Sequence, residues 1–125
     1  MSDRRPVLLV EDDSDIREMI GDILEHKGYN VMTASSGQEA LDRLATPLLP
    51  GLILLDLMMP GMSGVEFRKA QTQDPRIAPI PVVVLSGDAG IERKSDALGV
   101  AGYVKKPIEL RLLIDIVDRF CGARG

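Results

Sequence analysis

Residues Gly51–Gly64 have the sequence GLILLDLMMPGMSG. Four apolar residues, Leu52–Leu55, run directly into Asp56, and a proline-glycine pair follows at positions 60 and 61. A short apolar run that ends in a turn is typical of a strand buried on both faces. A charged carboxylate beside such a strand loses hydration, so it needs a cation, hydrogen bonds or a proton as compensation. The sequence therefore predicts that other parts of the chain supply partners for Asp56.

The rest of the chain repeats this pattern, because short apolar runs alternate with segments of helical periodicity. The predicted strands cover residues 7–10, 29–34, 51–56, 81–86 and 101–104, and the predicted helices cover 16–27, 36–44, 64–71, 88–98 and 110–121. Five strands that alternate with five helices predict an α/β fold: one doubly wound, five-stranded parallel sheet with right-handed crossovers and helices on both faces.

Local signals set the ends of some elements. Gly28 is a natural stop for the first helix, and Ser36 and Glu39 have the spacing of a capping box at the start of the second. In the third helix, Val65 and Phe67 are predicted to contact the core.

Bulk properties narrow the class of protein. The chain has 125 residues, enough for one domain, and a net charge of −4 that argues against direct binding of nucleic acid. Its single cysteine, Cys121, rules out an intrachain disulfide and fits a reducing, cytoplasmic setting. The apolar run Val7–Val10 is too short for a signal peptide, and no run is long enough to cross a bilayer.

Polar residues follow the carboxyl ends of the predicted strands. They are the acidic run 11–13 (Glu-Asp-Asp), Asp56, Ser86 and Lys106. In open parallel sheets, sites form at this edge, so these side chains are predicted to share one crevice. Carboxylates suit Mg²⁺, while a hydroxyl and an ammonium suit phosphoryl oxygens. The natural nucleophile of such a site is Asp56.

These motifs resemble the receiver domain of the bacterial two-component response regulators. The resemblance rests on LLVEDD (8–13), LLDLMMPGMSG (54–64), VVVLSG (82–87) and YVKKP (103–107). It spans residues 1–125, with a core of about 6–121. It implies a flavodoxin-like fold with strand order 2-1-3-4-5. After the last helix only GARG remains, so we expect either a stand-alone regulator or a piece of a longer protein.

The resemblance also implies the roles of the site residues. Mg²⁺ (or Mn²⁺) would be held by Glu11 through water, by Asp12 and Asp56 directly, and by the backbone carbonyl of Met58. Asp56 would accept a phosphoryl group from a phosphohistidine on a sensor histidine kinase or a histidine phosphotransfer protein. Ser86 would bind a phosphoryl oxygen.

The same resemblance selects one of two adjacent lysines. The functional lysine directly precedes a proline, which points to Lys106 rather than Lys105 as the second ligand of the phosphoryl oxygens. The Lys106–Pro107 bond is expected to be cis.

A conformational switch is implied as well. Tyr103 would turn inward as Ser86 moves toward the phosphoryl group. An unknown output partner would then bind to the face formed by the fourth helix, the fifth strand and the fifth helix. In this interpretation the chain is a regulatory phosphoacceptor and not an enzyme. Asp88, two residues after Ser86, is a candidate for orienting an attacking water during dephosphorylation.

Each residue also has a simpler interpretation. The acids from Glu11 to Asp15 could only favour the start of a helix through its dipole, Ser86 could be a turn residue, and Lys106 could be a solvated surface lysine. Tyr103 could be an ordinary strand residue. Met58 and its neighbour Met59 are best explained as loop packing.

Three other functions compete with phosphoacceptance. A receiver-like docking module would keep the fold without becoming phosphorylated. An aspartate-nucleophile phosphohydrolase of the haloacid dehalogenase type needs a second acid two residues after the nucleophile, where Met58 stands. A flavodoxin-like FMN carrier needs a loop rich in Gly, Ser or Thr after the first strand, where this chain has acids that would repel a phosphate.

Overall fold

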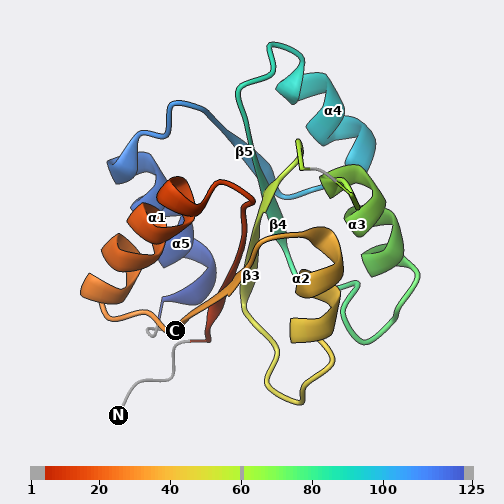
Figure 1. The fold of residues 1–125 in the computed structure, drawn as a ribbon, viewed down its shortest axis with the longest axis horizontal. Helices are drawn as coiled ribbons and strands as arrows, with labels where there is room; N and C mark the ends of the chain where they lie inside the picture. The colour runs from red at the N-terminus through yellow and green to blue at the C-terminus, as the bar shows by residue number, and fades with distance from the viewer. Residues whose placement is uncertain (1–4, 60, 123–125) are drawn as a thin grey trace.

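The computed structural model describes residues 5–59 and 61–122. Within them, five parallel strands form one sheet in the order β2-β1-β3-β4-β5 (Figure 1). The strands are β1 (Val7–Val10), β2 (Val31–Ala34), β3 (Leu52–Asp56), β4 (Val82–Ser86) and β5 (Gly102–Lys105). The fold class and the strand order are those predicted. The proline of the predicted turn, Pro60, lies outside the described residues.

Two layers of helices cover the sheet. The helices are α1 (Ser14–His26), α2 (Gly37–Arg43), α3 (Gly64–Thr72), α4 (Ile91–Leu98) and α5 (Leu110–Cys121). Helices α1 and α5 lie on one face of the sheet, and α2, α3 and α4 lie on the other (Figure 1). Because both faces are covered, the central strands must be apolar on both sides, which is why they read as continuous apolar runs. No helix in the described part of the chain is long and apolar enough to cross a membrane.

The core is divided by the sheet into two halves. Ile53 and Leu55 of β3 belong to the half under α2, α3 and α4, whereas Leu52 and Leu54 belong to the half under α1 and α5. All four side chains are fully buried. The strand that carries Asp56 is therefore packed on both faces, and this packing fixes the position of its end.

The structure corrects the predicted start of two elements. Strand β2 begins at Val31, two residues after Tyr29, whose buried hydroxyl donates a hydrogen bond to the Asp118 carboxylate. Helix α4 begins at Ile91 and not at Asp88, because the Asp88 carboxylate accepts the Gly90 N–H and forms a turn before the helix.

The predicted capping box at α2 is only half formed. The Ser36 hydroxyl accepts the Glu39 N–H, but the Glu39 carboxylate turns back to the Ser35 N–H and hydroxyl. A complete, reciprocal box stands instead at the start of α3, between Ser63 and Glu66.

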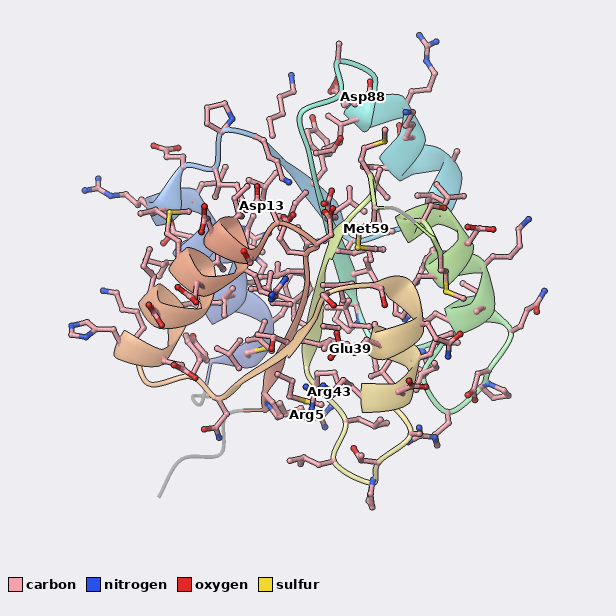
Figure 2. All side chains as sticks on the ribbon, in the orientation of Figure 1. Arg5, Asp13, Glu39, Arg43, Met59 and Asp88 are labelled. Atoms are coloured by element: carbon pink, nitrogen blue, oxygen red, sulfur yellow. The ribbon has the colours of Figure 1, made fainter. Side chains whose placement is uncertain are left out.

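Two pairs of residues were predicted to pack, Val65 with Phe67 and Met58 with Met59. In each pair the prediction is wrong for one residue. In α3, Phe67 is fully buried as predicted, whereas Val65 is 42% exposed. In the loop after β3, Met59 packs into the core (Figure 2), whereas Met58 is 66% exposed. In both pairs the neighbouring side chain points out to solvent.

Candidate functional site

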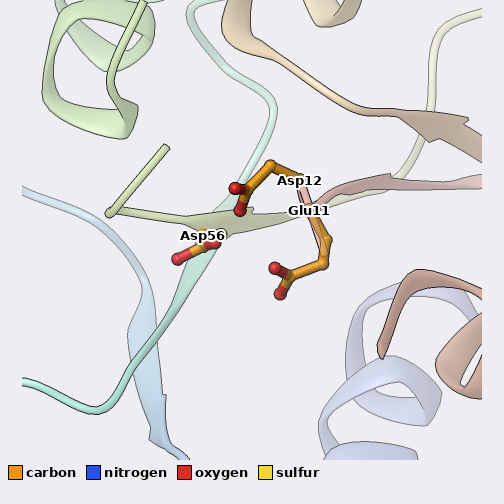
Figure 3. A group of neighbouring side chains, drawn as sticks. All are labelled: Glu11, Asp12 and Asp56. Carbon is orange, nitrogen blue, oxygen red and sulfur yellow. The ribbon is translucent and has the colours of Figure 1, made fainter. Parts of the chain in front are cut away.

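Three carboxylates meet at the carboxyl edge of the sheet. Strand β1 pairs with β3, with Val10 opposite Leu55, so the residues that follow these two lie side by side. One carboxylate oxygen from each of Glu11, Asp12 and Asp56 lies within 4.8 Å of the others. Figure 3 shows the three side chains gathered at the ends of their strands. Glu11 and Asp56 are buried, whereas Asp12 is exposed.

The ammonium group of Lys106 enters this acidic cluster. Its Nζ lies 3.0 Å from Glu11 Oε1 and 3.7 Å from Asp56 Oδ2. The backbone explains why it can reach: the Lys106 N–H donates to the Ser86 carbonyl at 2.9 Å, which extends the β4–β5 pairing by one residue. Lys105 points to solvent, and the bond between Lys106 and Pro107 is cis, as expected.

The buried hydroxyl of Ser86 stands at the end of β4, the strand next to β3. Ser86 is one residue beyond Leu85, which lies opposite Asp56 in the register. Its Oγ accepts the Asp88 N–H at 3.0 Å. That bond uses the oxygen as an acceptor, so the hydroxyl hydrogen is left to donate to a further group.

Burial and charge raise the pKa of Asp56. Loss of hydration is the largest cause, followed by the hydrogen bond and charge of Glu11, and together they raise the pKa to about 7. The Met58 N–H, which donates to Asp56 Oδ1 at 3.1 Å, and the charge of Lys106 act in the opposite direction. Two carboxylates this close resist ionising together without additional positive charge.

The pKa of Lys106 is raised, although burial alone would lower it. Burial would lower it, but the hydrogen bond to Glu11 and the charges of Asp56, Glu11 and Asp12 outweigh burial and raise it. The lysine is therefore firmly cationic and supplies one positive charge to three acids.

A divalent cation fits what the cluster leaves unsatisfied. Glu11 Oε1 is buried, lies 3.0 Å from Lys106 Nζ and accepts no backbone N–H among the described residues. Oxygen donors are what Mg²⁺ takes, and it commonly binds through one or two carboxylates with the remaining positions open. Glu11, Asp12 and Asp56 can therefore hold such an ion. The contribution of the Met58 carbonyl remains a prediction.

Tyr103 and Asp88 both bond to the region of α4. Tyr103 is half-buried and packs against the core, and its hydrogen bond with Glu92 is the main cause that raises its pKa. Asp88 lies just before α4 (Figure 2). Its carboxylate accepts the Gly90 N–H and pairs with Lys94 of α4. The role of Asp88 in orienting an attacking water remains a prediction. The switch role of Tyr103 remains a prediction.

Sequence reasoning missed two residues that hold the site. Arg17 of α1 donates to the Glu11 carbonyl at 2.8 Å, and Gly64 of α3 packs against the backbone of Asp56 and Leu57. The small residue in the quoted stretch was a usable signal for Gly64, because a glycine often marks a close backbone approach. An arginine in a first helical turn carries no comparable signal.

The raised pKa of Asp56 predicts how stability depends on pH in the absence of divalent cations. The folded state binds this proton more tightly than the unfolded state does. The contribution of Asp56 is therefore fully present below pH 4 and is lost as pH rises through about 7. By pH 8, ionisation should cost on the order of 2–4 kcal/mol. Urea denaturation in EDTA should show Asp56→Asn to be more stable than the wild type by this amount at pH 8, with little difference near pH 4. An equal difference at both pH values would contradict the raised pKa.

Comparison with known proteins agrees with this geometry. The family model of the response regulator receiver domain matches residues 7–118. The polar-differentiation response regulator DivK of Brucella ovis is 33% identical over 120 residues, which cover 94% of this chain and 97% of DivK. The phosphate regulon transcriptional regulatory protein PhoB of Pseudomonas aeruginosa is 35% identical over 112 residues, which cover 88% of this chain and 48% of PhoB.

Solved structures give the same result. The chemotaxis response regulator CheY4 of Vibrio cholerae superposes with a TM-score of 0.83 at 33% identity, over 94% of this chain and 98% of CheY4. A response regulator receiver protein from Pseudomonas putida gives a TM-score of 0.85 at 30% identity, over 95% and 99%. Sequence, fold and site thus lead to one conclusion: the chain belongs to the response regulator receiver domain family of two-component signalling.

Proposed function

We propose that the chain accepts a phosphoryl group on Asp56 from a phosphohistidine, in a reaction that depends on Mg²⁺. The observation that carries this proposal is the convergence of Glu11, Asp12 and Asp56 with the ammonium of Lys106 at one edge of the sheet. Ser86 ends the neighbouring strand and has a hydroxyl hydrogen to donate. The donor would be a sensor histidine kinase or a histidine phosphotransfer protein.

The positions of these groups support one course of the reaction. A carboxylate oxygen of Asp56 attacks phosphorus, the phosphorus–nitrogen bond of the phosphohistidine breaks, and its electron pair leaves on the imidazole. Lys106 and Ser86 bind the oxygens of the transferred group. A bound Mg²⁺ supplies positive charge that favours the ionised form of Asp56 and offsets the charge of the phosphoryl group. Met58 would offer its backbone carbonyl as a further ligand.

The domain and its output follow from the same proposal. Residues 1–125 form one receiver domain with a core of about 6–121, which acts as a regulatory phosphoacceptor and not as an enzyme with a turnover substrate. Phosphorylation adds nearly two negative charges beside Lys106 and Ser86. A conformation in which these two residues lie closer to the added group is then favoured over the unphosphorylated conformation. Ser86 and Tyr103 would transmit the change to α4, β5 and α5, where the output partner binds.

The experiment that tests the proposal uses acetyl phosphate as a small donor. Wild-type protein incubated with acetyl phosphate and Mg²⁺ should gain the mass of one phosphoryl group, and EDTA should prevent the gain. Absence of labelling at saturating Mg²⁺ would favour the alternative of a receiver-like docking module that is not phosphorylated. In that case a titration with Mg²⁺ would still show whether the acidic cluster binds the ion.

The donor protein is expected to dock beside Lys106. A shallow, mostly apolar hollow of about 300 Å³ is lined by Ile16, Met19, Lys106, Pro107 and Ile108. Met19 is 43% exposed at this hollow. A charge in the hollow would lose hydration when the donor covers it. Met19→Asp should therefore slow phosphotransfer from a phosphorylated histidine phosphotransfer protein by about tenfold or more.

Two comparisons separate docking from chemistry. Labelling of Met19→Asp by acetyl phosphate should equal that of the wild type, because this small donor needs no docking surface. Leu48→Asp is the matched control, since Leu48 is also exposed but precedes β3, at the opposite edge of the sheet. If both variants slow the phosphotransfer protein equally, the hollow is not its docking surface.

A further inference from the structure

Arg17 reaches from α1 to the backbone that carries the acidic pair. Its Nη1 donates to the Glu11 carbonyl at 2.8 Å and lies 3.5 Å from the Asp12 carbonyl. The helix fixes where this side chain starts, because Asp13 caps α1 and the Arg17 N–H bonds the Asp13 carbonyl. A half-buried guanidinium thus ties the first turn of α1 to the end of β1.

The loop from Glu11 to Asp13 depends on few other contacts. The Glu11 N–H continues the sheet by donating to the Ala34 carbonyl at 3.0 Å, and the Asp13 N–H reaches Glu11 Oε2 at 3.3 Å. The carboxylate of Asp12 is exposed and receives no hydrogen bond within residues 5–59 and 61–122. Arg17 contacts the carbonyls of both Glu11 and Asp12, so it helps to fix the backbone from which the Asp12 side chain starts.

Arg17 has two opposing effects on a bound metal ion: its charge repels the ion, whereas its hydrogen bonds orient the ligands. The two effects differ in size. A cation at a partly exposed position repels Mg²⁺ only weakly, because solvent and salt screen the interaction. Residues that orient metal ligands matter more, and their loss typically weakens metal binding by about 10- to 100-fold. Glu39 also interacts with the charge of Arg17, although the pKa of Glu39 is lowered chiefly by Ser35 and more by Arg43 than by Arg17.

We propose that Arg17 is a positioning residue for the metal site, which acts through the backbone carbonyls of Glu11 and Asp12 to aim their carboxylates at the ion. The inference rests on the proposed Mg²⁺ dependence of the chain. It predicts that the affinity for Mg²⁺ depends on Arg17, whereas the chemistry at saturating Mg²⁺ does not.

The test measures Mg²⁺ binding to the unphosphorylated protein by isothermal titration calorimetry. Arg17→Ala should raise the Kd for Mg²⁺ about tenfold. Arg17→Lys, which keeps one donor and the charge, should recover part of the loss. In acetyl phosphate labelling, the half-saturating Mg²⁺ concentration should rise by a similar factor, while the rate at saturating Mg²⁺ stays within about twofold of the wild type.

Controls separate positioning from general effects. Arg119→Ala removes an exposed arginine from the far end of α5, and Glu39→Gln removes an acid that interacts with the charge of Arg17; both should leave the Kd for Mg²⁺ unchanged. Thermal unfolding in EDTA measures any purely structural cost of Arg17→Ala, and the rise in Tm on adding Mg²⁺ should be smaller for this variant than for the wild type.

Two results would overturn the inference about Arg17, and a third would overturn the proposed function as well. A Kd for Arg17→Ala equal to or below that of the wild type would show that Arg17 does not aim the ligands, and so would a loss of labelling that saturating Mg²⁺ does not restore. In both cases the proposed function stands if the wild type is labelled in Mg²⁺. Absence of Mg²⁺ binding and labelling by the wild type would overturn the proposed function itself.

Discussion

Asp56→Asn should abolish labelling by acetyl phosphate in the presence of Mg²⁺. The amide is not a carboxylate nucleophile and is a weaker ligand for a hard cation, yet it has nearly the same shape, so the sheet should be retained. The neighbouring acids cannot replace it easily: Glu11 is buried against Lys106, and the exposed Asp12 sits on the loop after β1 and not at the end of β3. Intact-mass analysis after incubation with acetyl phosphate provides the measurement.

The control for this experiment is Asp115→Asn, which makes the same chemical change on the exposed surface of α5 and should be labelled like the wild type. Urea denaturation in EDTA at pH 8 should show that Asp56→Asn is folded and more stable than the wild type, so a loss of labelling cannot come from unfolding. Equal labelling of Asp56→Asn and the wild type would sink the assignment of Asp56 as the acceptor.

The sheet could be predicted because its environment leaves a strong pattern in the sequence. Strands buried on both faces must be apolar along their length, and β1, β3 and β4 are, apart from Asp56 and Ser86 at the ends of β3 and β4. The carboxyl ends of parallel strands share one edge, so the meeting of Glu11 with Asp56 and Lys106 followed from element order alone. This part of the prediction needed no knowledge of side-chain conformation.

The parts that could not be predicted depend on local choices between hydrogen bonds. Asp88 can start a helix or close a turn, and its bond with the Gly90 N–H delays α4 by three residues. Glu39 fits a capping box by its spacing, but its carboxylate meets Ser35 instead. Periodicity does not resolve which of several nearby donors a short polar side chain takes.

Contacts between a helix side chain and the backbone of another segment are also hidden from sequence patterns. Arg17 looks like an ordinary exposed helix residue, and only the path of the chain after β1 brings the Glu11 carbonyl within its reach. The exposure of Val65 beside the buried Phe67 has the same origin, because it depends on how α3 is rotated against the sheet. Such features follow from packing and not from spacing.

Gly64→Ala is the second change for which we expect a large effect. Gly64 is the first residue of α3, and a Cβ added there would lie 2.7 Å from the Asp56 carbonyl oxygen and 2.7 Å from the Leu57 α-carbon. Both are backbone atoms at the end of β3, so neither can rotate out of the way. Overpacking of this kind should lower the free energy of unfolding by about 3 kcal/mol. Because the clash pushes on Asp56 itself, we expect slower labelling by acetyl phosphate as well.

Gly21→Ala provides the matched control for this prediction. Gly21 is a buried residue of helix α1, but a Cβ added there meets nothing within 4 Å. The same substitution should therefore raise the free energy of unfolding, by about 0.5–1 kcal/mol, because alanine favours the helix more than glycine does. Urea denaturation at pH 8 compares the two variants directly. If Gly64→Ala were as stable as Gly21→Ala and labelled at the wild-type rate, then the close approach of α3 to the end of β3 would not be what holds Asp56 in place.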